Sequence, residues 1–290
     1  MSGREIARVT RGEISFAAVL LFALGAATPT LVSAAKQYLK PGGAFAGLNS
    51  ATAGARTQKD LPVGQHALQL YSMATPNGQK VTIALEEMGL RYDAWYIGIM
   101  DQDQFTSGFV AVNPNSKIPA MVDKDGPGGK PVNLFESGSI LLYLAEKSGK
   151  LLPKDPALRT ECLNWLFFQV GAAPYFGQYG HFARYAPIKI KYGIDRYALE
   201  TKRILSVLDQ RLMGRTFLVG EELTIADLAW MPWVQCLSVF YKGDEPLGLS
   251  EYQEVMRWKE NLLSRPAIAK GMRINSPAEE NQQYKEYHSS

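Results

Sequence analysis

The order of short apolar runs between residues 67 and 149 constrains this chain more than any other feature. ALQLYSM alternates in polarity like a strand, and the TPNG that closely follows it is a turn. The next segment, GQKVTIALEEMGL, places Val81, Ala84, Leu85 and Met88 at helical spacing, and RYDAWYIGI is a second strand. A strand, a helix and a second strand within about 30 residues make a βαβ unit, whose strands are parallel.

Two further strands and a helix follow the βαβ unit. NPNSKIPAMVD contains a third strand that begins at Pro119, GPGGKP is a hairpin-like turn, and VNLFE is the fourth strand. ESGSILLYLAEKSG has the pattern of a closing helix. The order βαβ-ββα is the thioredoxin pattern, so residues 67–149 are predicted to form a thioredoxin-like domain.

Long helical segments replace this pattern from about Leu158 onward. They are RTECLNWLFFQVGAA, IKIKYGIDRYALETKRILSVLDQRLM, TIADLAWMPWVQCLSVF and YQEVMRWKENLLSR. We therefore predict an all-helical C-terminal domain over residues 158–275, followed by a polar tail over 276–290. The predicted fold class is α/β plus all-α. Residues 36–66 are rich in Gly and Ala without periodicity, which predicts an extended N-terminal arm.

Residues 1–35 have the layout of a targeting segment. Arg4, Arg8 and Arg11 precede a run that carries no charge from Ile14 to Ala35 and ends in small residues. This order is typical of a signal peptide, so we expect export to the periplasm with cleavage. The alternatives are an uncleaved anchor, or a cytoplasmic protein with an unprocessed leader or a mis-called start.

Charge, histidines and cysteines exclude several kinds of site. The formal net charge is +3 without a basic stripe, so nucleic acid is not an expected partner. The three histidines are far apart, and no metal site is predicted. Cys162 and Cys236 lie in apolar stretches outside any CxxC pair. We expect two buried free thiols rather than a disulfide or a catalytic cysteine.

Glu136-Ser137-Gly138 lies between a predicted strand and a predicted helix. Ser137 is a helix-capping residue type, and the amides and dipole of a helix start suit a carboxylate. Glu136 is suited to an ammonium group, so the pair fits an α-amino acid moiety. An ordinary capped helix is the structural alternative.

Lys117-Ile118-Pro119 opens the third strand. Because a proline there donates no ladder bond, Ile118 can offer backbone groups to an extended peptide. We hypothesise a cis Ile118–Pro119 bond and a carboxylate partner for Lys117. The alternative is a turn beside a solvated lysine.

Thr75-Pro76-Asn77 opens the first helix. The Thr75 hydroxyl, the Asn77 amide and nearby N–H groups are donors at a positive helix end, where a thiolate is stabilised. The alternative is a cap containing proline.

Other notable segments are assigned structural roles. Thr224 and Asp227 fit a capping box. The Trp and Phe residues of NWLFF and AWMPWV are expected in the core. PYFGQYGHFARYAP has no clean helical period, so it is either the lining of an aromatic pocket or a packed interhelical loop.

TPNGQK, NPNSKIPA, FESGSILLYLAEK and TIADL occur in an order that resembles the glutathione transferase superfamily, from about Gly43 to about Asn275. The chain is most similar to the bacterial Nu class and to the related group that contains the yeast nitrogen-catabolite prion protein. The resemblance implies that the substrate is glutathione and that different residues bind its parts. Glu136 and Ser137 would bind the γ-glutamyl end, Ile118 beside cis Pro119 the cysteinyl backbone, and Thr75 and Asn77 the sulfur.

The resemblance implies four further glutathione contacts. Lys117 and Gln104 would meet the glycyl end or a second glutathione. Arg196 would reach the site from the helical domain or from a dimer partner, and Asn49 would contact ligand from the arm.

The resemblance also implies the chemistry. Many transferases activate the thiol with a Tyr, Ser or Cys near the end of the first strand, whereas here the sulfur position falls to Thr75 and Asn77. Nu-class proteins share this pattern and resemble glutathione-dependent disulfide reductases with weak transferase activity, active as homodimers on small-molecule or peptide disulfides. The alternatives are a conjugating transferase for hydrophobic electrophiles and a non-catalytic glutathione-binding or regulatory protein.

Overall fold

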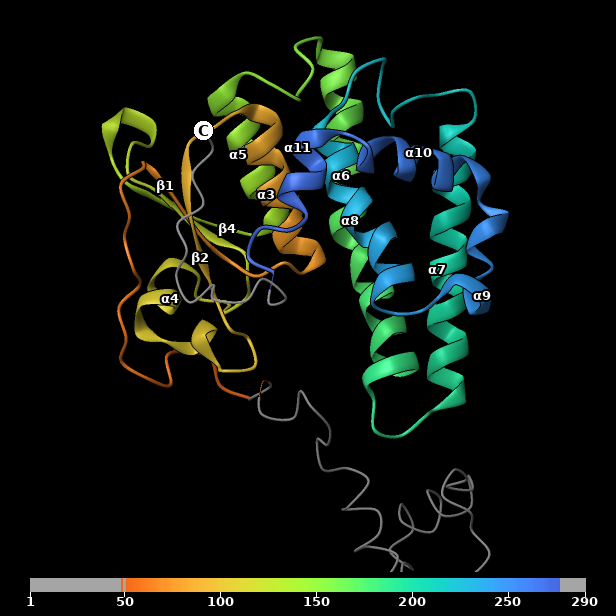
Figure 1. The fold of residues 1–290 in the computed structure, drawn as a ribbon, viewed down its shortest axis with the longest axis horizontal. Helices are drawn as coiled ribbons and strands as arrows, with labels where there is room; N and C mark the ends of the chain where they lie inside the picture. The colour runs from red at the N-terminus through yellow and green to blue at the C-terminus, as the bar shows by residue number, and fades with distance from the viewer. Residues whose placement is uncertain (1–47, 49–50, 277–290) are drawn as a thin grey trace, which may run out of the picture.

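A four-stranded mixed sheet forms the centre of the first lobe (Figure 1). In the computed structural model, which describes residue 48 and residues 51–276, the strands are β1 (Leu68–Ser72), β2 (Tyr92–Tyr96), β3 (Ala120–Asp123) and β4 (Val132–Phe135). Their order is β2-β1-β3-β4; β1 and β2 are parallel, and the other two pairs are antiparallel. The predicted fold class is confirmed. The expected leader at 1–35, Asn49 and nearly all of the predicted tail lie outside the described residues.

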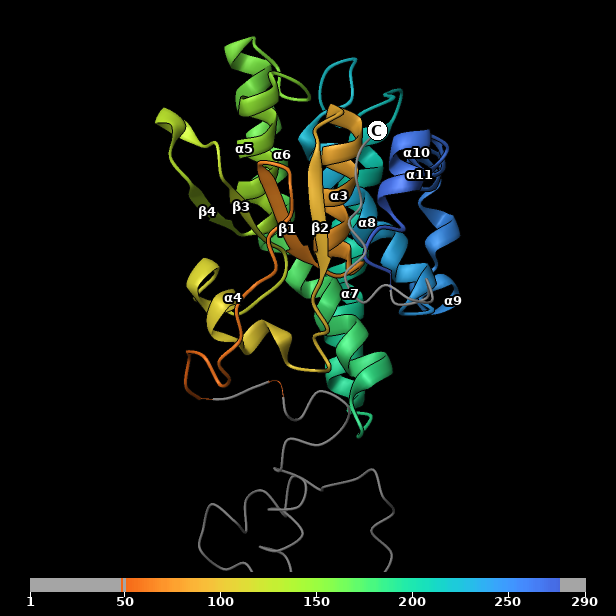
Figure 2. The ribbon, with the colours of Figure 1, turned by 60° about the vertical axis from the view of Figure 1, so that its left-hand side comes forward.

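The strands of this sheet bury both faces. Leu70 points to the core shared with α3 (Pro76–Met88) and α5 (Ser137–Ser148), while its neighbour Tyr71 belongs to a second cluster with Phe109 of α4 (Ser107–Val112). Successive strand residues face opposite sides, so β1 serves both layers. Figure 2 shows α3 on the side of the sheet nearer the helical lobe, with α4 away from it.

The second lobe is helical and is built around one buried helix. It comprises α6 (Pro156–Gly180), α7 (Lys191–Leu212), α8 (Ile225–Val239), α9 (Asp244–Leu247), α10 (Gln253–Leu263) and α11 (Pro266–Gly271). Helix α8 contacts α6 and α10 in its own lobe and α3 and α5 in the other. Helix α11 returns to α3 so closely that a Cβ on Gly271 would lie 2.6 Å from the Ile83 Cα.

The aromatic segment at the end of α6 is helical over most of its length, so one of its two alternatives, a packed interhelical loop, is wrong. Helix α6 runs to Gly180, and one wider π-helical turn, His181–Tyr185, follows it. This wider turn interrupts the 3.6-residue repeat, which explains why the sequence shows no clean period. The Phe182 ring stacks on Tyr197 of α7 with centroids 5.4 Å apart.

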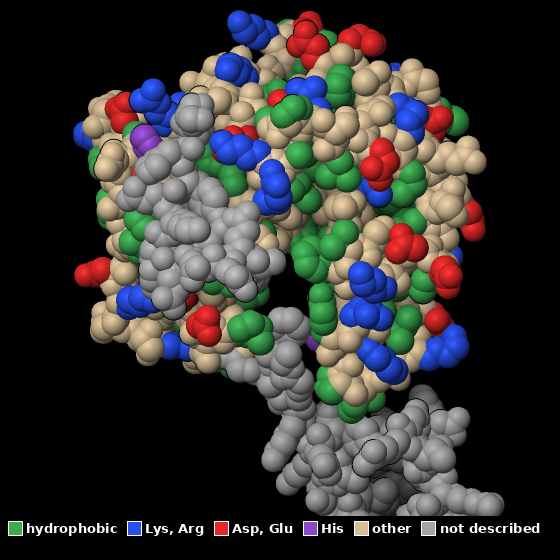
Figure 3. Space-filling model, viewed as in Figure 1, with side chains coloured by type: hydrophobic (Ala, Val, Ile, Leu, Met, Phe, Trp, Pro, Cys, Tyr) green, Lys and Arg blue, Asp and Glu red, His purple; other side chains and the backbone are tan. Residues whose placement is uncertain are grey.

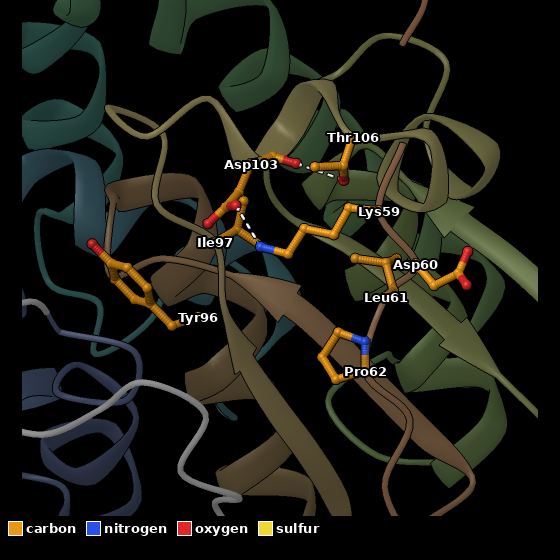
Figure 4. A pocket seen from close by; sticks show the side chains of 8 residues that line it. All are labelled: Lys59, Asp60, Leu61, Pro62, Tyr96, Ile97, Asp103 and Thr106. Carbon is orange, nitrogen blue, oxygen red and sulfur yellow. Dashed lines mark hydrogen bonds and ion pairs between the residues drawn. The ribbon is translucent and has the colours of Figure 1, made fainter. Parts of the chain in front are cut away.

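The segment between β2 and β3, for which the sequence predicted no element, contains a 3-10 turn (Asp103–Phe105) and helix α4. The described part of the N-terminal arm holds it in place. The main-chain N–H of Gly108 donates to the Lys59 carbonyl, and Lys59 Nζ lies 2.9 Å from Asp103 Oδ1 across a small crevice (Figure 4). A six-residue helix is too short to be stable alone, so these long-range contacts decide its formation.

Among the other structural predictions, one is partly wrong: Phe167 of NWLFF, which was expected in the core, is 65% exposed. The capping box of Thr224 and Asp227 is present at the start of α8. Cys162 and Cys236 are free and buried, and burial raises the pKa of both thiols. Within the part of the chain that the structure describes, no helix has the length and apolar character to cross a bilayer.

Candidate functional site

The start of α3 is a tight turn that presents donors. Thr75 is the N-cap, and its Oγ1 accepts from the Gly78 N–H at 3.3 Å. Pro76 occupies the first helical position, where a missing N–H costs nothing. The turn requires glycine at position 78, because a Cβ there would lie 2.0 Å from the Met73 carbonyl oxygen. The helix dipole therefore ends in an open, ordered turn at Asn77.

The Asn77 side chain is held by its oxygen. Trp233 of α8 donates its indole N–H to Asn77 Oδ1 at 2.9 Å, and the Ser137 hydroxyl lies 3.5 Å from the same oxygen. These contacts join α3, α5 and α8, which come from both lobes. They leave the amide nitrogen of Asn77 as the group that can donate to a ligand.

The start of α5 differs from its prediction in one respect. Ser137 does not cap the helix: Glu136 is the N-cap, with φ at 67°, and Ser137 is the first helical residue. The reason is that the buried Ser137 hydroxyl is taken up by Lys80 Nζ of α3, which lies 3.2 Å away. Glu136 is exposed beside it. The two residues remain adjacent at a helix start, as an α-amino acid moiety requires.

Lys80 is a buried lysine behind this helix start. It is 1% exposed, and its Nζ also donates to Gln169 Oε1 of α6 at 2.6 Å. Burial lowers the pKa of Lys80 to about 7, against the opposing effect of Glu136. A lysine that titrates near neutral pH therefore lies directly behind the site.

The Ile118–Pro119 bond is cis, which confirms the hypothesis. Lys117 beside it is exposed, and its carbonyl accepts from the Asn113 amide at 2.6 Å. Gln104, by contrast, is 4% exposed; its Nε2 donates to the Ile99 carbonyl, and its Oε1 has no hydrogen-bond partner among the described residues. Its buried side chain anchors the loop before α4, so its predicted contact with glutathione has no direct support.

Two further predicted glutathione contacts, Arg196 and Asn49, stay predictions. Arg196 lies on α7 with half of its side chain exposed, and its NH1 is 3.8 Å from Glu200 one turn further along. Asn49 lies outside the described residues. The cluster at the two helix starts therefore consists of Thr75, Asn77, Glu136 and Ser137, with Lys80 and Trp233 behind them.

Tyr71 does not take the place of a thiol-activating residue. Its side chain is 2% exposed, and its hydroxyl donates to the Pro62 carbonyl at 2.7 Å. Burial, and to a lesser extent the charge of Asp93, raise the pKa of Tyr71 to about 12. The donors at the start of α3 are neutral groups at a positive helix end, an arrangement that can stabilise a thiolate.

The surface between the lobes is hollowed on one face, and hydrophobic side chains lie along the wall formed by the helical lobe (Figure 3). Within residues 51–276, no group of His, Cys, Asp and Glu is arranged to hold a metal ion. The described residues of the site thus offer polar donors at two helix starts.

Sequence reasoning missed Lys80, Gln169 and Trp233. Trp233 was expected in the core, and it is indeed 8% exposed, but its indole N–H reaches Asn77. Composition and periodicity do not indicate that Lys80 is buried in the site, since lysine is rarely buried. The only available signal was its position three residues after Asn77, on the same side of the helix.

Comparison with known proteins agrees with this arrangement. The glutathione S-transferase N-terminal domain model matches residues 74–147, and the corresponding C-terminal domain model matches residues 194–266. Disulfide-bond oxidoreductase YghU of Escherichia coli (strain K12) is 53% identical over 243 residues, which cover 81% of this chain and 84% of that protein.

Two solved structures are similar over most of the chain. Glutathione transferase YghU from Streptococcus pneumoniae, complexed with glutathione, has a TM-score of 0.77 and 48% identity, covering 80% of this chain and 92% of that one. A Pseudomonas putida glutathione transferase, with one glutathione disulfide bound per subunit, has a TM-score of 0.72 and 47% identity, covering 73% and 94%. Fold, site and sequence agree: this chain belongs to the glutathione S-transferase family.

Proposed function

We propose that this protein is a glutathione-dependent disulfide reductase with weak glutathione S-transferase activity. The observation that carries the proposal is the start of α3, where Asn77 is oriented as a donor, while burial raises the pKa values of Tyr71 and Cys236. The name of the Escherichia coli relative and the glutathione disulfide in the Pseudomonas putida structure support the same chemistry.

The reaction needs two glutathione molecules and no protein thiol. The first glutathione thiolate attacks one sulfur of the substrate disulfide, forms a mixed disulfide and releases the other sulfur as a thiolate. The second glutathione attacks the glutathione sulfur of that mixed disulfide, which releases the remaining substrate thiolate. Two glutathiones are oxidised to one glutathione disulfide, and the substrate disulfide is reduced to two thiols that take up the two glutathione protons.

The predicted residues divide this work. Glu136 and Ser137 hold the γ-glutamyl group, the Ile118 backbone pairs with the cysteinyl residue beside Pro119, and Lys117 meets a carboxylate. Thr75 and Asn77 stabilise the attacking thiolate. Each good donor at a positive helix end lowers the pKa of a thiol, and one pKa unit corresponds to about 1.4 kcal/mol.

The first test is the initial rate of glutathione-dependent reduction of 2-hydroxyethyl disulfide. We expect a clear rate in the wild-type protein and a loss of tenfold or more in kcat/KM in Asn77→Ala, about 1.4 kcal/mol of transition-state stabilisation. Asn261→Ala, at an exposed position of α10, is the matched control and should keep the full rate.

The same preparations are assayed for conjugation to an aryl halide. Conjugation without disulfide reduction would show a conjugating transferase instead, and binding of glutathione without either rate would show a non-catalytic protein. Either result contradicts the proposal.

We also propose that the protein acts as a homodimer. Phe167 of α6 is 65% exposed and Leu199 of α7 is 67% exposed, and apolar side chains of this size on neighbouring helices favour a second copy as partner. Sedimentation velocity tests this, since one chain has a mass of 32.1 kDa. A single species of monomer mass at micromolar concentration would contradict it.

A further inference from the structure

Trp233 fixes which way the Asn77 amide faces. An indole N–H can only donate, so the 2.9 Å contact requires the oxygen of the Asn77 carboxamide and not its nitrogen. Trp233 itself is 8% exposed on α8, the most buried helix of the second lobe. The orientation of a residue in the first lobe is thus set by a rigid element of the second.

A second donor acts on the same oxygen. Lys80 Nζ donates to Ser137 Oγ at 3.2 Å, so the Ser137 hydroxyl proton is directed elsewhere, and Asn77 Oδ1 lies 3.5 Å away. Gln169 Oε1 holds Lys80 from the other side at 2.6 Å. These contacts form a buried polar chain from α6 through α3 and α5 to α8.

The orientation matters because the two ends of a carboxamide act oppositely on an anion. With Oδ1 held, the Asn77 Nδ2 hydrogens are the donors available to a thiolate. The terminal torsion of asparagine is broad and roughly two-fold, so an unheld amide also samples the state with oxygen toward the sulfur. That state repels the thiolate.

We propose that Trp233 is the principal positioning residue for the glutathione thiolate, and that Lys80 assists it through Ser137, because together they keep the Asn77 amide N–H groups turned toward the sulfur. This inference rests on the proposed function and adds to it the residues that orient the thiolate donor. It connects the helical lobe to the chemistry through a single hydrogen bond.

The test is Trp233→Phe, which removes the indole N–H and keeps an aromatic ring. The matched control is Trp230→Phe on the same helix, where the indole N–H donates to the Trp165 carbonyl at 3.1 Å. The ultraviolet absorbance of the glutathione thiolate is titrated in each complex. We expect the pKa of the bound thiol to rise in Trp233→Phe but not in Trp230→Phe. In Trp233→Phe, kcat/KM for the disulfide should be about tenfold lower, while the glutathione dissociation constant should stay within about twofold of wild type.

A double-mutant cycle separates positioning from packing. If Trp233 acts through Asn77, Trp233→Phe has no further effect on the thiol pKa in the Asn77→Ala background. Lys80→Met should also raise the thiol pKa, but by less than Trp233→Phe does, because the 3.5 Å Ser137–Asn77 contact is the longest of the contacts in this buried polar network.

The outcomes distinguish this inference from the proposed function. An unchanged thiol pKa in Trp233→Phe, or additive effects in the double-mutant cycle, overturns the inference. The proposed function still stands in that case if the wild-type protein reduces the disulfide. If the wild-type protein binds glutathione without turnover, the function fails and the titration alone decides the inference. If it does not bind glutathione, both are overturned.

Discussion

Helices α3 and α8 both begin with a threonine cap, and they use it differently. At the start of α8, Thr224 and Asp227 satisfy each other, and Asp227 also accepts from the Leu218 N–H and the Trp258 indole N–H. At the start of α3, the only side-chain cap that the described residues supply is a 3.3 Å contact between Thr75 Oγ1 and the Gly78 N–H. One helix start is closed by the chain, and the other is left open.

The two helix starts therefore have different roles: the start of α8 stabilises the fold, and the start of α3 can bind a ligand. A helix start whose donors are all paired within the protein has nothing to offer a ligand, but it ties neighbouring segments together. The start of α3 keeps donors for an anion, and its geometry is supplied by partners outside the helix, namely Trp233 and Ser137. Mutations at the two starts should therefore affect different measurements.

The largest effect is expected for Asp227→Ala. It leaves several buried donors without an acceptor, which should lower the free energy of unfolding by about 3–5 kcal/mol. Urea unfolding measures this, and Asp227→Asn, which keeps one oxygen, should lose less. The folded fraction of either variant should retain its disulfide rate; a rate lost while the protein is fully folded would contradict the comparison.

Lys80→Met should change how stability depends on pH. Burial lowers the pKa of Lys80 from 10.5 to about 7, so between these values the unfolded chain binds a proton that the folded chain does not. The free energy of unfolding in the wild-type protein should therefore rise with pH across this window, by at most about 1.4 kcal/mol per unit from this group. Urea unfolding at pH 7, 8 and 9 should show a flatter dependence in Lys80→Met, and parallel curves would show that Lys80 is not responsible.

The smallest effects compare the two caps directly. Thr224→Ala should cost about 1–2 kcal/mol of stability and leave the activity of the folded protein unchanged. Thr75→Ala should cost less than about 1 kcal/mol, since its cap contact is long, but should lower kcat/KM for the disulfide. Thermal unfolding and steady-state rates on both variants test this. Equal stability losses with equal activities would remove the distinction between the two helix starts.

Elements that repeat their own spacing were predictable from the sequence, and elements held by distant contacts were not. The strand of Leu68–Ser72 and the helix of Pro76–Met88 each show a period along their whole length. Helix α4 was missed because six residues carry little periodicity, and its stability comes from the arm. The turn at His181–Tyr185 was missed because a wider helical turn has no place in a 3.6-residue pattern.

In the candidate site, too, local patterns were predictable and long-range contacts were not. Motifs of adjacent residues, such as Glu136-Ser137, identified the helix starts. Their partners come from elsewhere in the chain: Lys80 is 57 residues from Ser137, and Trp233 is 156 residues from Asn77. Such pairings depend on how the lobes dock, which spacing along one segment does not encode. For this reason Ser137 was expected to cap a helix and instead accepts from Lys80.

The end of the described chain lies against the start of α3. The Ala74 N–H donates to the Asn275 carbonyl at 2.9 Å, and Gln79 Nε2 donates to the Met272 carbonyl at 3.0 Å, on either side of the turn that carries Asn77. A ribosome releases residues 272–275 long after it has released the turn. A nascent chain that has not yet reached residue 275 therefore lacks these hydrogen bonds on either side of the turn.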